Sequence, residues 1–358
     1  MQQQETGPTL TNVTLMGRQV VKFGLIGLVV LMVGRITVNG LIAYWKATHP
    51  EPPPAPSVGF GKLPEINFPA QTEDEMPLSY KLETATGTTP DFGDRAKVYF
   101  MPKASASLLA DQAAKEKASN LGYVFEPEVI GTELYRWSKS DPLLSTLELN
   151  IRSYSFSIAT NYLSLPELLV NTTAPSGFEA VADVKNLLKR ADLLPDDIAT
   201  ASGEIVYLKS LGGDLAPAVS QSDADFIQVD LNRNPIDGVF RMFTPQGYQG
   251  IISAILTGYY EGRDAVIDIT YNYHPVDYEE IHTYPIRTSQ SAWQLLQAGE
   301  GYIAEKGSTD TAVIREVFLA YFDSYEEQEY LQPIYVFENK DTGFLGYVSA
   351  VDPKLIQK

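Results

Sequence analysis

Residues 23–45 read FGLIGLVVLMVGRITVNGLIAYW and are apolar except for Arg35, Thr37 and Asn39. A helix of this length can cross a bilayer core of roughly 30 Å. Tyr44 and Trp45 end the stretch with aromatic rings, which are typical of a membrane–water interface. Because no small-residue cleavage site follows it, the pattern favours an uncleaved signal anchor over a removable signal peptide.

The charges on either side of this stretch predict its orientation. Arg18 and Lys22 precede it, whereas only Lys46 follows closely. Basic residues are retained on the cytoplasmic side of a membrane. We therefore expect residues 1–22 to form a cytoplasmic tail, residues 23–45 to span the plasma membrane once, and the C-terminal part to be extracytoplasmic.

Arg35 is the unusual residue of the predicted anchor. A cation near the centre of a bilayer costs about 2.5 to 3.5 kcal/mol on insertion scales. Arg35 and Asn39 are four residues apart and share one helix face. One interpretation is that both contact a polar or acidic group of another transmembrane helix, and the alternative is a tilted helix that tolerates the charge.

The overall composition excludes several classes of protein. The 358 residues are 44% hydrophobic, which is enough for folded cores. The chain has no cysteine, so disulfide scaffolds, thiolate metal sites and thiol nucleophiles are excluded. There are 27 Lys and Arg against 45 Asp and Glu, a formal net charge of -18, which argues against a nucleic-acid partner.

Beyond the anchor, the pattern predicts a linker and two folded domains. Residues 46–57 contain five prolines, which favour an extended polyproline spacer. Helical patterns are each followed by several strand patterns, which predicts an α+β fold of antiparallel sheets, each with a packed helix. We place the first α+β domain at residues 58–165 and the second at 176–358.

Two local patterns are informative about the elements of these domains. Ser176 and Glu179 have the spacing of a capping box and predict the start of a helix. The alternation of residues 146–158 shifts phase at Arg152 and Ser153, which indicates a β-bulge or a tight turn, with the bulge favoured. Further strand patterns follow at 204–208, 226–231, 239–243, 251–259 and 266–273.

No phosphate loop, zinc-protease motif or nucleophile elbow is present in the sequence. His274 and His282 with the acids near them could in principle hold a metal, but a hairpin explains their spacing. The segment from Asp230 resembles the opening of a calcium loop, yet Arg241 stands where a bidentate Glu is required. We therefore expect no catalytic residues, no metal and no cofactor.

Tyrosine is abundant, with 21 residues in the chain. This residue is common both in strands and at protein interfaces. Tyr271, Tyr273 and Tyr278 are the candidates for a partner-binding surface. The alternative interpretation places them in the core and on the sheet surface.

The last part of the chain carries a series of apolar segments in a characteristic order. They are YPIRT at 284–288, a short helix pattern around Trp293, VFLAYF at 317–322, LQPIYVF at 331–337 and YVSAV at 347–351. Over roughly residues 200–352 the chain resembles the closing part of the YycH/YycI family. The resemblance implies one N-terminal membrane helix, an exported α+β domain, and regulation of a membrane sensor kinase that controls cell-wall metabolism. It implies no catalytic residues.

These observations lead to one functional hypothesis and two alternatives. The leading hypothesis is a non-enzymatic, membrane-anchored protein of the bacterial cell envelope that binds a partner protein, such as a sensor kinase or an envelope assembly. The first alternative is a glycan-acting enzyme that uses carboxylates of acidic loops, such as Glu280 and Glu327. The second is a structural surface protein that self-assembles into a homo-oligomer.

Overall fold

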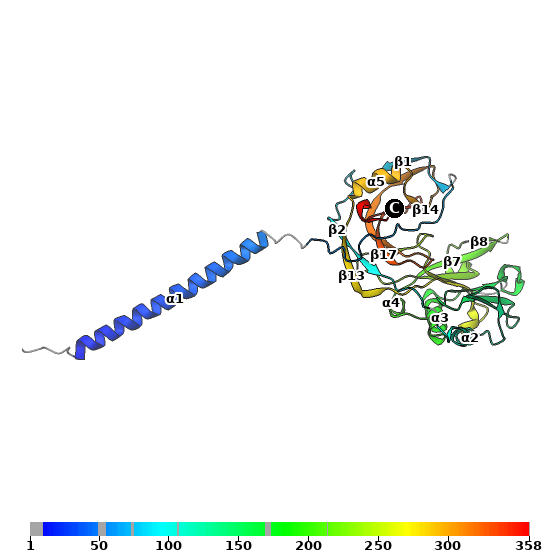
Figure 1. The fold of residues 1–358 in the computed structure, drawn as a ribbon, viewed down its shortest axis with the longest axis horizontal. Coiled ribbons are helices and arrows are strands. Elements are labelled where there is room, and N and C mark those ends of the chain that lie inside the picture. The colour runs from blue at the N-terminus through cyan, green and yellow to red at the C-terminus, as the bar shows by residue number, and fades with distance from the viewer. Residues whose placement is uncertain are drawn as a thin grey trace, which may run out of the picture. The chain divides into compact units, whose positions relative to one another are not determined.

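A computed structural model describes residues 10–48, 55–72, 75–105, 107–168, 173–212 and 214–357. The chain divides into two compact units, Met1–Ala55 and Pro56–Lys358. Among the described residues, the first unit contains one long helix and the second contains the sheets (Figure 1). The predicted α+β class with antiparallel sheets is confirmed.

Helix α1 spans Leu10–Thr48 and contains the whole predicted anchor. Its segment Thr14–Lys46 is long and apolar enough to cross a membrane, and none of that segment is buried against protein. A single membrane anchor and an N-terminal signal sequence share these properties. The helix begins at Leu10, so part of the predicted tail 1–22 is helical, and residues 49–54 of the predicted linker lie outside the described residues.

The larger sheet has nine strands in the order β3-β4-β5-β6-β12-β11-β9-β7-β8, and every pairing in it is antiparallel. Its strands are β3 (Glu128–Val129), β4 (Leu134–Lys139), β5 (Ser145–Asn150), β6 (Phe156–Thr160), β7 (Glu204–Leu211), β8 (Asp214–Pro217), β9 (Phe226–Leu231), β11 (Ile252–Thr257) and β12 (Val266–Tyr271).

Three helices accompany this sheet, namely α2 (Ala110–Asn120), α3 (Gly177–Arg190) and the short α4 (Asp196–Ala199). The predicted capping box is confirmed, because the Ser176 hydroxyl accepts the Glu179 amide while the Glu179 carboxylate accepts the Ser176 amide. The apolar side of α3 packs in one core with side chains of β9 such as Val229. The amphipathic spacing of α3 thus fixes which face of the sheet it covers.

The second sheet has seven strands, with the path β10-β16-β17-β18-β14 and with β2 pairing to both β13 and β17. Its strands are β2 (Arg95–Phe100), β10 (Met242–Phe243), β13 (Asp277–Pro285), β14 (Tyr302–Glu305), β16 (Glu316–Phe322), β17 (Tyr330–Asn339) and β18 (Phe344–Ser349). Helix α5 (Ser289–Gln297) packs against β18. Strands β1 (Ser79–Leu82) and β15 (Thr311–Ile314) form a separate parallel pair.

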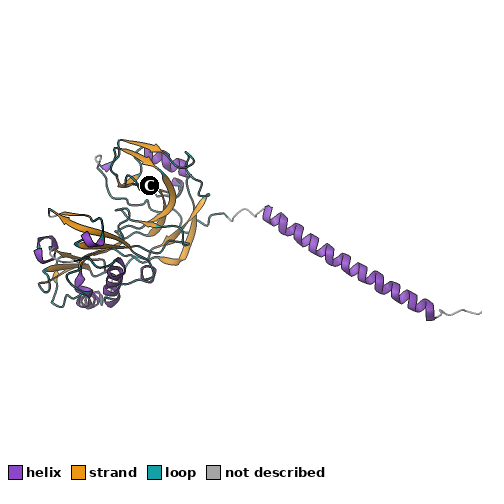
Figure 2. Ribbon diagram, turned by 180° about the vertical axis from the view of Figure 1, so that it is seen from behind, coloured by secondary structure: helices purple, strands orange, loops and turns teal. Residues whose placement is uncertain are grey.

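Short 3-10 helices complete the fold at Tyr162–Ser164, Pro166–Leu168, Gln221–Asp223, Gly262–Ala265 and Pro353–Leu355. Figure 2 shows the sheets and helices of the compact unit from behind.

The predicted division into domains 58–165 and 176–358 does not match the strand pairing. Strand β2 of the first range pairs with β13 and β17 of the second, and β6 of the first range pairs with β12 of the second. Residues from both ranges therefore build both sheets, and Pro56–Lys358 is one compact unit. Sequence patterns identify local elements, whereas these pairings join segments more than one hundred residues apart.

The phase shift near Arg152 comes from a tight turn and not from the favoured bulge. Strands β5 and β6 pair in register up to Leu149 and Phe156. In the turn between them, the Asn150 side-chain oxygen accepts the amides of Arg152 and Ser153. The alternation restarts after the turn because the chain reverses there.

A buried arginine joins the two sheets. Arg233 follows β9, and its side chain is 0% exposed. Its guanidinium lies 2.7 Å from Asp323 after β16 and 2.7 Å from Asp197 in α4, and it also donates to the His274 carbonyl. The guanidinium carbon lies 4.4 Å from the centre of the Tyr273 ring. Although burial lowers it, the pKa of Arg233 is held well above its usual value by Asp323 and Asp197.

We predict that Asp323→Ala lowers the free energy of unfolding by about 3–5 kcal/mol, because it leaves a buried charge without one of its partners. The measurement is urea unfolding of the detergent-solubilised chain followed by tryptophan fluorescence. Asp341→Ala is the matched control, because its ion pair with Arg315 has side chains 68% and 55% exposed. That control should cost less than about 1 kcal/mol, and equal losses in the two variants would contradict the role of Arg233.

A second prediction concerns pH. Burial raises the pKa of Asp268 on β12 to about 6. The folded chain therefore keeps a proton that the unfolded chain releases near pH 4, so this group makes the fold less stable as pH rises from about 4 to 6 and above. Asp268→Asn should raise stability at pH 7 by about 1–3 kcal/mol and flatten that pH dependence. Exposed Asp310→Asn is the control, and a less stable Asp268→Asn at pH 7 would refute the assignment.

Candidate functional site

A cleft of about 930 Å³ lies between the two sheets and is here termed the inter-sheet cleft. One wall comes from β7 and β9 of the nine-stranded sheet, and the other comes from β14, β17 and β18 of the seven-stranded sheet. Residues of the segment 241–249, which lies between β9 and β11 and contains β10, also line the cleft. The lining residues used below are Glu204, Ile205, Val206, Gln228, Asp230, Arg241, Tyr248, Glu305, Glu338 and Lys340.

The carboxylate of Asp230 lies on the β9 wall and is nearly buried, with 4% of the residue exposed. Gln228 donates to it at 2.8 Å and the Gly250 amide at 3.1 Å. Burial raises the pKa of the Asp230 carboxyl, and burial likewise raises the pKa of Glu305 on the opposite wall. Both walls therefore present acids with a weakened tendency to ionise.

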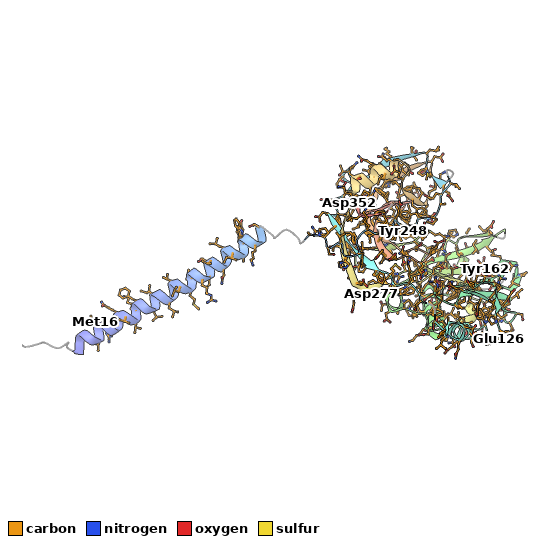
Figure 3. All side chains as sticks on the ribbon, viewed as in Figure 1. Met16, Glu126, Tyr162, Tyr248, Asp277 and Asp352 are labelled. Carbon is orange, nitrogen blue, oxygen red and sulfur yellow. The ribbon has the colours of Figure 1, made fainter. Side chains whose placement is uncertain are left out.

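Glu338 on β17 is the most enclosed acid of the cleft, with 2% of the residue exposed. The Tyr248 hydroxyl donates to its Oε1, whereas its Oε2 has no hydrogen-bond partner among the described residues. Burial and the adjacent Glu338 raise the pKa of Tyr248. Figure 3 marks the position of Tyr248 in the compact unit. Glu338 thus retains an unused acceptor.

Arg241 is the main cation of the cleft. Its guanidinium carbon lies 5.0 Å from the centre of the Tyr248 ring and 5.2 Å from that of Phe243, and its Nη2 lies 3.3 Å from Glu204. The lining contains four acids against Arg241 and Lys340. By charge, this arrangement suits a ligand that carries a positive group.

The residues predicted to bind partners lie in different environments. Arg35 and Asn39 have exposed side chains on α1. Tyr271 is only 4% exposed and stacks on Phe156, so it belongs to the core and not to a surface. Tyr273 is partly buried beside Arg233, whereas Tyr278 is 40% exposed and donates to Asp197 at 2.8 Å. These three tyrosines therefore do not form one exposed surface.

The two histidines considered as metal ligands are engaged separately. His274 Nε2 lies 3.3 Å from the Tyr325 carbonyl, and His282 Nδ1 lies 3.1 Å from the Ser57 hydroxyl. Asp237 in the calcium-like segment pairs with Lys97 at 2.7 Å, and it lies in a turn closed by the antiparallel bridge of Ile236 and Phe240. Within the described ranges, no group of three or more His, Cys, Asp or Glu is placed to hold a metal ion.

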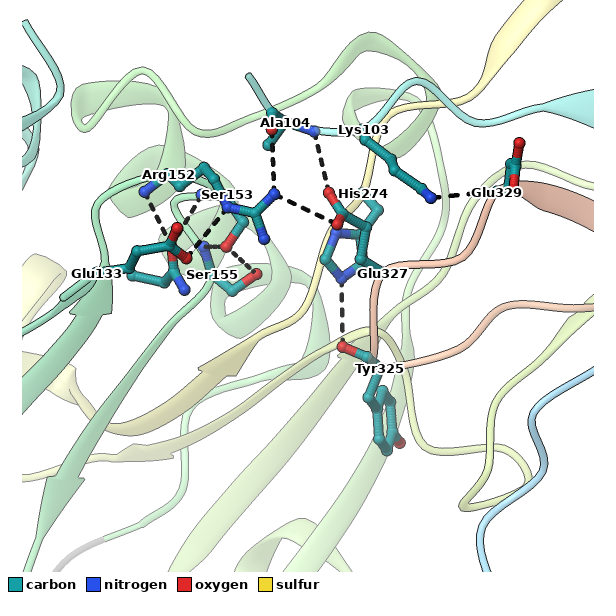
Figure 4. A network of polar contacts seen from close by, with 11 residues as sticks. Lys103, Ala104, Glu133, Arg152, Ser153, Ser155, His274, Tyr325, Glu327 and Glu329 are labelled. Carbon is teal, nitrogen blue, oxygen red and sulfur yellow. Dashed lines mark hydrogen bonds and ion pairs between the residues drawn. The ribbon is translucent and has the colours of Figure 1, made fainter. Parts of the chain in front are cut away.

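The acids considered for glycan chemistry have other surroundings. Glu327 accepts the Ala104 amide at 3.0 Å and lies 3.4 Å from Arg152 (Figure 4). Arg152 also binds Glu133 at 3.1 Å, so this network is a second polar joint between the sheets. Glu280 is exposed on β13. The cleft acids Glu204, Asp230, Glu305 and Glu338 lie on four different strands, so no spacing in the sequence brings them together.

Comparisons with solved structures give distant likenesses. No family model matches the chain, and no curated protein matches it. The chain is similar to the crystal structure of an uncharacterized protein from Eubacterium rectale, with 10% sequence identity and a TM-score of 0.33. The likeness covers 72% of this chain and 84% of that chain, and at this TM-score it carries no argument about fold or function.

We predict strong energetic coupling between Tyr248 and Glu338. Tyr248→Phe should cost about 1–3 kcal/mol of stability, because it removes the only described hydrogen bond to a buried carboxylate. In a Glu338→Leu background the same change should cost less than about 1 kcal/mol, since no carboxylate remains to be satisfied. Urea unfolding of the four chains measures the cycle, and additive losses would contradict the coupling.

Proposed function

We propose that this chain is a single-span membrane protein that presents its compact unit outside the cytoplasm and acts by binding a partner protein. The observation that carries the proposal is the uncovered apolar surface of α1. Side chains such as Leu25, Met32 and Ile36 are 60%, 64% and 67% exposed. Exposed apolar surface on this scale requires a lipid or protein environment.

The orientation follows from the flanking charges. Arg18 and Lys22 before the apolar stretch exceed Lys46 after it, which supports a cytoplasmic N-terminus. The acidity agrees with this arrangement, because residues 58–358 contain 23 Lys and Arg against 43 Asp and Glu. Acidic residues have little influence on membrane orientation. The acidity of the compact unit therefore does not oppose its export across the plasma membrane.

The proposed contact with a membrane partner involves Arg35 and Asn39. Both are exposed on α1 and are four residues apart, hence on one face. An acidic group in a neighbouring transmembrane helix would offset the cost of placing Arg35 in the bilayer. A membrane sensor kinase is the partner class that the YycH/YycI resemblance implies, and it provides transmembrane helices for such a contact.

Binding is favoured over glycan hydrolysis by the state of the acidic loops. Glu327 is held by Arg152 and Ala104 and serves to join the sheets. A carboxylate so engaged is poorly placed to act as a proton donor or nucleophile. Glu280 is exposed on β13 and lies outside the proposed helix contact. Glu280→Ala should leave partner binding unchanged.

The test of this function is cross-linking capture from detergent-solubilised membranes. The intact chain should capture a membrane protein, and Arg35→Leu should reduce that capture at least ~10-fold through loss of a buried ion pair. Thr37→Leu is the matched control, because Thr37 bonds to the Val33 carbonyl of its own helix. Equal capture by Arg35→Leu and the intact chain would refute the helix contact.

The membrane orientation of the chain is tested by a separate labelling experiment in the same cells. The chain has no cysteine, so an introduced one is the only thiol label. A membrane-impermeant maleimide should label Lys340→Cys in intact cells and Gln19→Cys only after lysis. The reverse pattern, or a mature chain lacking α1, would overturn the proposed anchoring.

A further inference from the structure

One strand of the cleft wall is only half paired. Strand β7 pairs along Glu204–Leu208 with β9, but its other side pairs with β8 only from Leu208 to Leu211. Among the described residues, no strand pairs with Glu204–Val206 on the side away from β9.

The backbone of Ile205 faces this open side. Leu208 accepts the Asp225 amide on the β9 side, whereas Tyr207 accepts the Ala218 amide on the β8 side. Because backbone groups alternate along a strand, Ile205 shares the direction of Tyr207. Its N–H and C=O are therefore presented to an incoming strand.

This open edge lies in the wall of the inter-sheet cleft. Glu204, Ile205 and Val206 all line the cleft. The Ile205 side chain lies towards the start of α3, since a Cβ on Gly177 would be 2.4 Å from its Cδ1. Ile205 and Val206 are adjacent, so their side chains point to opposite faces of the sheet, yet both residues line the cleft. The cleft therefore extends around the edge of β7.

The edge also lacks the usual protection against pairing. Exposed edges are commonly blunted by lysine, proline or a bulge. Here Ile205 and Val206 are apolar and each 39% exposed. The register of β7 with β9 is regular over Glu204–Leu208, without a bulge.

The charges identify the kind of strand that fits. Four acids of the cleft face Arg241 and Lys340, and Arg241 is already paired with Glu204. Glu338, nearly buried, has a carboxylate oxygen without a partner among the described residues. A second copy of this acidic chain would be repelled, because residues 58–358 carry 43 acids against 23 bases.

We infer that the inter-sheet cleft binds an extended peptide segment of a partner protein, which adds as a strand to the Glu204–Val206 edge and directs a Lys or Arg side chain towards Glu338. Main-chain hydrogen bonds to Ile205 provide affinity, and the acid provides selectivity. The site deepens the proposed binding role and rests on it, by giving the chemistry of the partner.

The test uses the full chain in detergent and fluorescent seven-residue peptides of sequence TVTKTVT and TVTETVT, with anisotropy as the readout. TVTKTVT should bind at least ~10-fold tighter than TVTETVT, because only its cation complements the acids. N-methylation of the alternate amides that face the edge should weaken TVTKTVT by a further factor of ~10 through loss of main-chain hydrogen bonds.

Variants of the chain locate the binding. Ile205→Pro removes the outward N–H without removing a bond to β9, and it should weaken TVTKTVT at least ~10-fold. Leu215→Pro is the matched control, since Leu215 lies on the outer edge of β8 and, like Pro217, directs its amide away from β7. Glu338→Gln should abolish most of the preference for Lys over Glu, while Glu329→Gln, at an acid outside the cleft lining, should not.

Three results would overturn the inference. They are equal binding of the two peptides, equal effects of Ile205→Pro and Leu215→Pro, and binding that tolerates N-methylation while spermidine alone displaces the peptide. The last result would assign the cleft to a small cation. The peptide measurements use purified chain, whereas the labelling experiment tests the cellular location. A negative result in one experiment is therefore distinguishable from a negative result in the other.

Discussion

The contact on which the compact unit depends is the buried cluster of Arg233, Asp197 and Asp323. Removing three charges from water is costly, so the arrangement persists only because each charge has close partners. Arg233 leaves the nine-stranded sheet at the end of β9, and Asp323 leaves the seven-stranded sheet at the end of β16. The cluster thereby fixes the ends of two strands from different sheets against each other, and Arg152 with Glu327 adds a second joint.

The cleft lies between the two sheets that this joint connects. The sheets are tied where β9 and β16 end, and the cleft lined by Glu204, Asp230 and Glu338 lies between strands of the two sheets. The acids of the cleft come from elements far apart in the chain.

Much of the fold follows from local sequence patterns. The Ser176 capping box, the strand at 226–231 and the apolar helix around Arg35 are local features that depend on residues a few positions apart. The predictions that were wrong concern residues whose partners are distant in the sequence. The domain boundary between 165 and 176 missed the pairing of β2 with β13. Tyr271 was a candidate for a partner-binding surface, although its side chain is buried in the core. The cleft was not predictable for the same reason, since Glu338 lies within an apolar strand.

The placement of β2 affects how the chain is made. Strand β2 is synthesised well before β13 and β17, which flank it, and Leu63 forms a bridge with Ile356 near the other end of the compact unit. During synthesis both edges of β2 therefore stay unpaired until β13 and β17 are made, after all the strands of the nine-stranded sheet. Correct folding of this chain should depend on keeping that segment apart from other chains until the last strands are made.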